Sequence, residues 1–204
     1  MGGSREPIRL VPTGIANLEA VAAAFRRLGR EVEIAGSPRV ILEAGHLVLP
    51  GVGSFASGVD ALDDAGWAEP LRERVQEGRP TLAICLGLQL LCESSAEAPG
   101  VAGLGCIPGT VTRFGDDVRV PQLGWNAVRA NGDARYLKSS VMYFANSYRL
   151  ESPPPGWAVA TARHGGTFVA ALERDGVLAC QFHPELSGTA GQGLLSSWLE
   201  RSRC

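Results

Sequence analysis

The stretch Thr81-Leu82-Ala83-Ile84-Cys85-Leu86-Gly87-Leu88-Gln89 decides the fold of this chain. Its first five residues are typical of a strand at the centre of a parallel sheet, buried on both faces. The residues after Cys85 carry a helical pattern, which predicts a helix over Leu86–Ser94. Cys85 therefore lies at a strand-to-helix turn, and its thiol is the reactive group if the chain is an enzyme.

Strands and helices alternate ahead of this stretch. We predict strands over Ile8–Val11, Glu31–Ala35 and His46–Leu49, helices over Asn17–Leu28 and from Ser37-Pro38, and helical structure between Phe55 and about Gly78. Strands joined through helices imply right-handed crossovers, and hence a parallel sheet covered on both faces.

The pattern changes after Gly103 to short β-like runs separated by glycine, asparagine or proline. We predict strands over Gly109–Phe114, Trp125–Arg129, Val141–Tyr148, Trp157–Arg163, Thr167–Glu173 and Val177–Phe182, and a closing helix over Leu194–Arg201. The expected fold is α/β: a central, mostly parallel sheet with helices on both faces and added antiparallel strands in the C-terminal half. We expect a single domain over residues 1–204, with 1–7 flexible.

Composition narrows the possible partners and compartment. The chain has 204 residues, 45% of them hydrophobic, and a net charge of −2 without a basic cluster, so we expect neither nucleic acid nor membrane as partner. The first apolar run is too short for a signal peptide or a membrane span, which predicts a cytoplasmic protein. Its 5 cysteines are odd in number and lack metal-ligand spacing, so we expect reduced thiols, no metal and no cofactor.

The turn at Cys85 is the first candidate site. An open α/β sheet places its active crevice at the carboxyl ends of its strands, and the positive end of a helix dipole favours the nucleophilic thiolate. Gly87 would let the helix pack closely against the sheet. A buried structural cysteine is the alternative reading, and the turn leaves the two about equally supported.

A histidine and a carboxylate form the second candidate site. His183 ends an apolar strand, and Glu185 follows two residues later, beyond Pro184. Glu185 can orient the imidazole and stabilise its cation, as the third member of a nucleophile–base–acid triad does. His46 precedes a strand and His164 belongs to a hairpin tip, so both are interpreted as structural.

The third candidate site is the turn Pro50-Gly51-Val52-Gly53. Its glycines permit unusual backbone angles and close approach, so its amides can point into the crevice. Together with the amide after Cys85 they would form an oxyanion hole.

These three sites resemble the class I (triad) glutamine amidotransferases. The matching motifs are Pro50-Gly51-Val52-Gly53-Ser54-Phe55, Ile84-Cys85-Leu86-Gly87-Leu88-Gln89 and Phe182-His183-Pro184-Glu185, in this order. Pro121–Asn126, Tyr143–Tyr148 and Ser187-Gly188 are similar more narrowly to the glutaminase subunit of imidazole glycerol phosphate synthase, from histidine biosynthesis.

The resemblance implies a glutaminase mechanism. Cys85 would attack the glutamine amide, His183 would protonate the departing ammonia and then activate water, and Glu185 would orient His183. The amides of Val52 or Gly53 and of Leu86 would form the oxyanion hole, while Gly51, Gln89, Ser147 and Tyr148 would bind glutamine. For Gln89, a solvated helix residue is the alternative.

The resemblance also implies a partner, a (β/α)₈-barrel cyclase subunit that forms a heterodimer with this chain and receives the ammonia. The sequence is consistent with this division because it contains no second catalytic constellation and no phosphate-binding loop. We expect glutamine hydrolysis to be slow alone and stimulated when the partner repositions the turn at Gly51–Gly53.

Several positions depart from the family pattern. Relatives usually carry Asp-Tyr-Gly and Gly-Asn where this chain has Pro12-Thr13-Gly14 and Ala16-Asn17, histidine at Gln122 and Asn146, and lysine at Leu186. Three alternatives therefore stay open: a paralogous subunit that supplies ammonia to a different synthase, a thiol hydrolase on a related scaffold, and a regulatory pseudo-amidotransferase.

Overall fold

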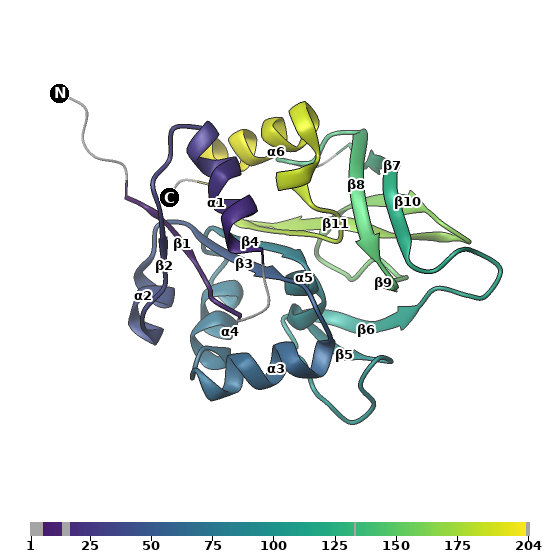
Figure 1. Ribbon diagram of the computed structural model, residues 1–204, viewed down its shortest axis with the longest axis horizontal. Coiled ribbons are helices and arrows are strands. Elements are labelled where there is room, and N and C mark those ends of the chain that lie inside the picture. The colour runs from purple at the N-terminus through teal and green to yellow at the C-terminus, as the bar shows by residue number, and fades with distance from the viewer. Residues whose placement is uncertain (1–5, 14–16, 133, 203–204) are drawn as a thin grey trace.

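A nine-stranded sheet with helices on both faces forms the body of the molecule (Figure 1). The computed structural model describes residues 6–13, 17–132 and 134–202. The strand order is β2-β1-β3-β4-β12-β11-β10-β7-β8. Its first five strands are parallel, comprising β1 (Ile8–Leu10), β2 (Val32–Ile34), β3 (Leu47–Gly51), β4 (Thr81–Cys85) and β12 (Val177–Cys180). Strand β4, from the opening stretch, lies between β3 and β12 within this parallel group.

Alternating residues of β3 and β4 divide the core into two layers. Val48, Leu82 and Ile84 pack on the side of α1 (Leu18–Arg27) and α6 (Gly188–Arg201). The residues of β3 and β4 that alternate with these three pack on the opposite face of the sheet. That face is covered by α2 (Pro38–Glu43), α3 (Phe55–Asp64) and α4 (Ala68–Gln76) (Figure 1). Successive side chains of a strand point to opposite faces, so a strand covered on both faces is apolar throughout.

The C-terminal half extends the sheet with antiparallel strands. These are β7 (Gln122–Ala130), β8 (Ser140–Asn146), β10 (Ala158–Arg163) and β11 (Thr167–Arg174). Strand β12 joins the two halves because it pairs in parallel with β4 and antiparallel with β11. The predicted α/β architecture, including the added antiparallel strands, is confirmed.

The predicted helix over Leu86–Ser94 is too long. Helix α5 ends at Leu91, and β5 (Cys92–Ser95) follows it directly. The N–H groups of Leu104 and Cys106 donate to the last carbonyls of α5, so the chain leaves the helix and pairs as β5 with β6 (Ile107–Arg113). A distant loop thus provides the partners that end the helix.

Two other predicted boundaries differ. The single run expected over Val141–Tyr148 forms β8 and a separate strand, β9 (Tyr148–Leu150), which pairs with β6 in a smaller three-stranded sheet. The last helix, α6, begins at Gly188, six positions before the expected start at Leu194. Glycines obscured this helix because they lower helix propensity. Gly191 is required by contact, since a Cβ there would lie 1.9 Å from the carbonyl oxygen of Pro184.

Some predictions concern residues that the structure does not describe. Residues 1–5, Gly14, Ala16 and Cys204 lie outside the described ranges. Among residues 6–13, 17–132 and 134–202, no helix is long and apolar enough to cross a membrane.

Candidate active site

Cys85 occupies a strained turn between β4 and α5. Its φ of 54° and ψ of −108° lie in a region that residues other than glycine rarely adopt, and such a backbone conformation costs on the order of 1–3 kcal/mol. The turn ends the central strand abruptly and presents the thiol at the carboxyl edge of the sheet. The N–H of Leu86, in the first turn of α5, has no acceptor within the helix and remains available to a ligand.

Two glycines allow the backbone to close around this turn. A Cβ at Gly87 would lie 2.1 Å from the carbonyl oxygen of Leu49 on β3. A Cβ at Gly51 would lie 2.9 Å from that of Leu86. Gly51 pairs with Cys85 across the β3–β4 ladder, so its role in the structure is close packing behind the cysteine.

His183 and Glu185 are paired. The His183 Nδ1 lies 2.8 Å from Glu185 Oε1, and the two side chains are only 8% and 5% exposed. The 3₁₀ turn Pro184–Leu186 places the carboxylate beside the ring. The His183 N–H donates to the carbonyl of Tyr143 on β8, which fixes the histidine against the antiparallel half of the sheet.

The electrostatics of this pair favour the imidazolium. Burial by itself lowers the pKa of His183, but hydrogen bonds and charge interactions with Cys85 and Glu185 outweigh it and raise that pKa from 6.5 to about 10. The histidine is therefore a cation at neutral pH. It can donate a proton to a departing group before it acts as a base.

A cavity of about 350 Å³ connects these groups. Most of the predicted site residues line it, namely Val52, Gly53, Cys85, Leu86, Gln89, Ser147, Tyr148 and His183. Glu185 stands behind His183, and Gly51 stands behind the turn, so neither belongs to the lining. Thus segments more than 100 positions apart in the sequence meet around one thiol.

Gln89 belongs to a buried amide network. Only 5% of its surface is exposed, so the alternative of a solvated helix residue is wrong. Its Nε2 donates to the carbonyl of Tyr148 at 3.2 Å and to Oε1 of Gln181 at 3.0 Å. Gln181 in turn directs its own Nε2 toward the Cys85 sulfur, 3.7 Å away. These bonds leave Oε1 of Gln89 as the atom that can accept from a ligand.

Comparison with known proteins decides the family. The sequence model described as glutamine amidotransferase class-I matches residues 10–200. The chain belongs to the class I glutamine amidotransferases. It is 40% identical over 196 residues to the imidazole glycerol phosphate synthase subunit HisH of Methanothermobacter thermautotrophicus, covering 95% of this chain and 98% of that protein. It is 43% identical over 188 residues to HisH of Thermus thermophilus, covering 92% of this chain and 93% of that one.

A fused relative and a solved structure add to this comparison. The chain is 40% identical over 199 residues to the chloroplastic imidazole glycerol phosphate synthase hisHF of Arabidopsis thaliana, of which it spans only 34%. A crystal structure of a glutamine amidotransferase superposes with a TM-score of 0.77 at 24% identity, covering 96% of this chain and 98% of that one, and this likeness shows the shared fold.

Sequence reasoning missed several residues of this amidotransferase site. Glu97 lines the cavity, and its carboxylate accepts the N–H of Phe55 at the start of α3. Ser187 accepts the N–H of Tyr143 and donates to the carbonyl of His183 at 2.6 Å, so it fixes the histidine strand. Gln181, whose side-chain amide points toward Cys85, directly precedes the Phe-His-Pro-Glu motif. A polar residue within an otherwise apolar predicted strand was the feature of the sequence that could have indicated it.

The departures from the family pattern lie close to the site. Gln122 and Asn146 are opposite each other on β7 and β8, both buried, and neither polar atom of the Gln122 side chain has a hydrogen-bond partner among the described residues. Thr13 donates to the carbonyl of Pro50, next to the glycine turn. Leu186 is 47% exposed on the surface beside His183.

The other histidines, and the other cysteines within the described residues, have structural surroundings. His46 packs edge-on against Trp198, and His164 contacts the ring of Phe114. Cys92, Cys106 and Cys180 are buried, and burial raises the pKa of each thiol. In the described part of the chain, no group of three or more histidine, cysteine or acidic residues could hold a metal ion.

Proposed function

We propose that the chain hydrolyses glutamine to glutamate and ammonia with Cys85, His183 and Glu185, and that it passes the ammonia to a cyclase subunit that makes imidazole glycerol phosphate. One observation carries the proposal: a thiol on a strained turn shares a cavity with a histidine that a buried carboxylate orients. The HisH relatives, similar over nearly their whole length, support the reaction and the pathway.

The first step forms a thioester. The Cys85 sulfur attacks the carboxamide carbon of glutamine, and the carbonyl oxygen becomes an oxyanion. The His183 cation then gives its proton to the departing nitrogen, and the carbon–nitrogen bond breaks to release ammonia. Because the pKa of His183 is about 10, this acid is already protonated when glutamine binds at neutral pH.

The second step hydrolyses the thioester. His183, now neutral, takes a proton from water as the water attacks the thioester carbon, and the carbon–sulfur bond breaks to give glutamate and the thiolate. During this attack the Cys85 sulfur is part of the thioester and carries no charge. Glu185 is then the negative group in contact with the forming imidazolium, so its charge matters most in this step.

The oxyanion hole combines α5 with the glycine turn. The amide of Leu86 opens α5, and Val52 and Gly53 line the same cavity from the end of β3. A well-placed donor of this kind contributes roughly 3 kcal/mol to transition-state stabilisation. Gly53 has a φ of 100°, a backbone angle that glycine adopts readily. A rotation of the peptide group next to Gly53 would turn a second backbone N–H into the oxyanion hole. We assign this change to partner binding, which couples hydrolysis to use of the ammonia.

The cavity contains groups suited to an amino acid. Oε1 of Gln89 and the carboxylate of Glu97 can accept hydrogen bonds from the α-ammonium of glutamine. Ser147 and Tyr148 also line the cavity. Because these groups hold the charged end of the substrate, its side-chain amide is free to reach Cys85.

An exposed apolar surface beside this cavity fits the cyclase subunit. Leu123, Trp125, Val141 and Leu186 are 65%, 59%, 50% and 47% exposed. The residues from β7 and β8 share the outer face of that ribbon, where Leu123 pairs with the cavity residue Ala145. The hisHF relative of Arabidopsis thaliana, of which this chain matches only one part, supports a partner subunit that lies next to this one. Leucine in place of the usual lysine at position 186 enlarges the apolar surface.

A reconstitution assay tests the proposal. The chain is combined with the cyclase subunit of the same organism and its nucleotide substrate, and glutamate and imidazole glycerol phosphate are measured. We expect glutamine-dependent product in the complex, little glutamate from the chain alone, and neither with Cys85→Ala. Equal glutaminase rates with and without the occupied cyclase would contradict the coupling. Turnover of peptides or esters in place of glutamine would contradict the reaction itself.

A further inference from the structure

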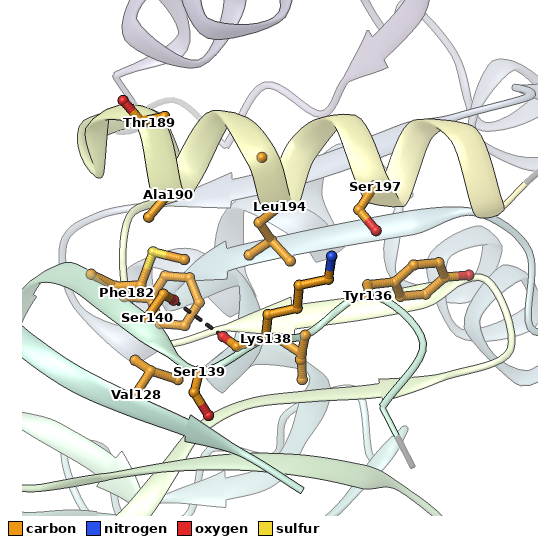
Figure 2. A pocket seen from close by; sticks show the side chains of 13 residues that line it. Val128, Tyr136, Lys138, Ser139, Ser140, Phe182, Thr189, Ala190, Leu194 and Ser197 are labelled. Atoms are coloured by element: carbon orange, nitrogen blue, oxygen red, sulfur yellow. Dashed lines mark hydrogen bonds between the residues drawn. The ribbon is translucent and has the colours of Figure 1, made fainter. Parts of the chain in front are cut away.

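A second cavity, of about 280 Å³, lies between α6, the β7–β8 ribbon and the segment Tyr136–Ser140 (Figure 2). It shares no lining residue with the cavity around Cys85. Its volume is close to the lower end of the range of small-molecule sites, about 300–1,000 Å³. Glutamine hydrolysis makes no use of it.

The lining of this cavity combines apolar and polar residues. Val128, Met142, Phe182 and Leu194 are apolar. Lys138, Ser139, Ser140, Thr189 and Ser197 are polar. Figure 2 shows the Lys138 side chain extending beneath α6, with its nitrogen near Leu194 and Ser197. Among the residues that the structure describes, no aspartate or glutamate lines the cavity.

Lys138 is the only lysine in a chain with 19 basic residues, and it is available to a ligand. Within residues 6–13, 17–132 and 134–202, its ammonium takes part in no ion pair and no hydrogen bond. The carboxylate of Glu173 accepts the N–H groups of Tyr136 and Leu137 at 2.9 and 3.0 Å. These bonds fix the segment before Lys138, so the position of the lysine backbone is held before any ligand arrives.

We propose that this cavity binds a small monocarboxylate with an apolar body. The carboxylate would pair with the Lys138 ammonium and accept from the Ser197 hydroxyl, while the body would pack against Phe182 and Leu194. A single cation matches a single negative charge, whereas recognition of a phosphate dianion ordinarily uses several donors or cations. An amino acid fits less well, because none of the described lining residues offers a carboxylate to its ammonium.

The cavity is next to the catalytic strand ends. Phe182, which lines the cavity, directly precedes His183, and Met142 precedes Tyr143, whose carbonyl accepts the His183 N–H. Helix α6 starts immediately after Ser187, which also bonds to His183. A ligand in this cavity would therefore contact the backbone neighbours of the catalytic histidine. The proposal for binding itself does not depend on glutaminase activity.

Calorimetric titration of the full chain with 3-phenylpropanoate tests the proposal. We expect saturable binding with a dissociation constant on the order of 1 mM or lower, the range open to a ligand of this size. The neutral 3-phenylpropanamide, phenylalanine and inorganic phosphate should each bind about tenfold more weakly or not at all. Cys85→Ala should bind as the wild type does, because the two cavities are separate.

Three variants locate the site. Lys138→Met should weaken binding about tenfold, as loss of one charge-assisted contact predicts. Arg129→Met is the matched control, since it removes an exposed cation from the opposite face of β7 and should leave binding unchanged. Gly193→Leu should abolish binding while α6 remains folded, because a Cβ at Gly193 meets nothing within 4 Å and leucine favours a helix. Absence of saturation by about 10 mM, or equal affinity for the acid and its amide, would overturn the proposal.

Discussion

The charge of Glu185 should matter more for thioester hydrolysis than for thioester formation, and Glu185→Gln isolates that charge. Glutamine keeps an oxygen that can accept from His183 Nδ1, so the variant retains a hydrogen bond but loses its charge assistance. The contact is 2.8 Å long between side chains that are 8% and 5% exposed, so solvent screens it little. A charge-assisted hydrogen bond contributes roughly twice as much as a neutral one, a difference of about 1.5 kcal/mol.

That difference has two measurable consequences. The pKa of His183, about 10 in the native protein, should fall by about 1, because 1.36 kcal/mol corresponds to one pKa unit. The turnover rate should fall about tenfold, since the imidazolium that forms during water attack loses the same stabilisation. Formation of the thioester should slow less, because in that step the contact with Cys85 still raises the pKa of His183. The glutamyl thioester should therefore accumulate.

Acid quench followed by mass spectrometry measures the thioester, and NMR titration of the His183 ring measures its pKa. Glu19→Gln, which removes an exposed carboxylate of α1, is the control and should change neither quantity. Native turnover and an unchanged His183 pKa in Glu185→Gln would refute the reasoning. Equal slowing of both steps would refute the assignment of Glu185 to hydrolysis.

The pKa of His183 also affects stability. It is raised in the folded state, so its contribution is fully present below about pH 6.5 and is lost as the pH rises through about 10. The contribution should be smaller in Glu185→Gln, and its loss should be complete at a lower pH, because the folded-state pKa of His183 is lower while the unfolded-state value is unchanged. Chemical unfolding at several pH values between these limits would measure the difference.

Packing, burial and exposure give three further predictions. Gly87→Ala should lower stability by about 3 kcal/mol and abolish activity, because its Cβ would meet the Leu49 carbonyl at 2.1 Å. Gly193→Ala has open space around its Cβ and lies inside α6, so in thermal unfolding and turnover assays it should raise stability by up to about 1 kcal/mol and leave turnover unchanged. In peptide mapping, a glutamine-directed electrophile should label Cys85 at neutral pH and leave Cys92 and Cys106 unlabelled. Burial raises the pKa of those two thiols to about 12 and about 11, so they carry little reactive thiolate. Equal labelling of all three cysteines would contradict this prediction. Leu123→Asp should weaken cyclase binding at least tenfold in calorimetry. Ile34→Asp, which changes a similarly exposed side chain on β2 at the other end of the sheet, should not. Similar losses in the two variants would place the interface elsewhere.

The candidate catalytic residues could be nominated from the sequence because each is positioned by its immediate neighbours. Cys85 ends an apolar strand, and Glu185 reaches His183 across one proline-containing turn, so short-range patterns were enough to nominate them. The parallel half of the sheet was predictable for the same reason, since strands buried on both faces are continuous apolar runs between helical patterns. The resemblance to the amidotransferases rested on these local motifs.

Tertiary structure alone decided which distant groups meet. Helix α5 ends at Leu91 because the loop at Leu104 and Cys106 supplies hydrogen bonds that no local pattern encodes. Glu97 and Gln181 reach the site from segments that are distant from Cys85 along the chain or in a different element. Gln89 is buried because Tyr148 and Gln181, both more than 50 residues away in the sequence, pack and hydrogen-bond against it. The cavity beside Lys138 arises where α6 crosses the β7–β8 ribbon, and three glycines in that helix had hidden its first turns. Sequence determines the features that depend on neighbours along the chain, whereas burial and contacts across the sheet depend on how the whole chain packs.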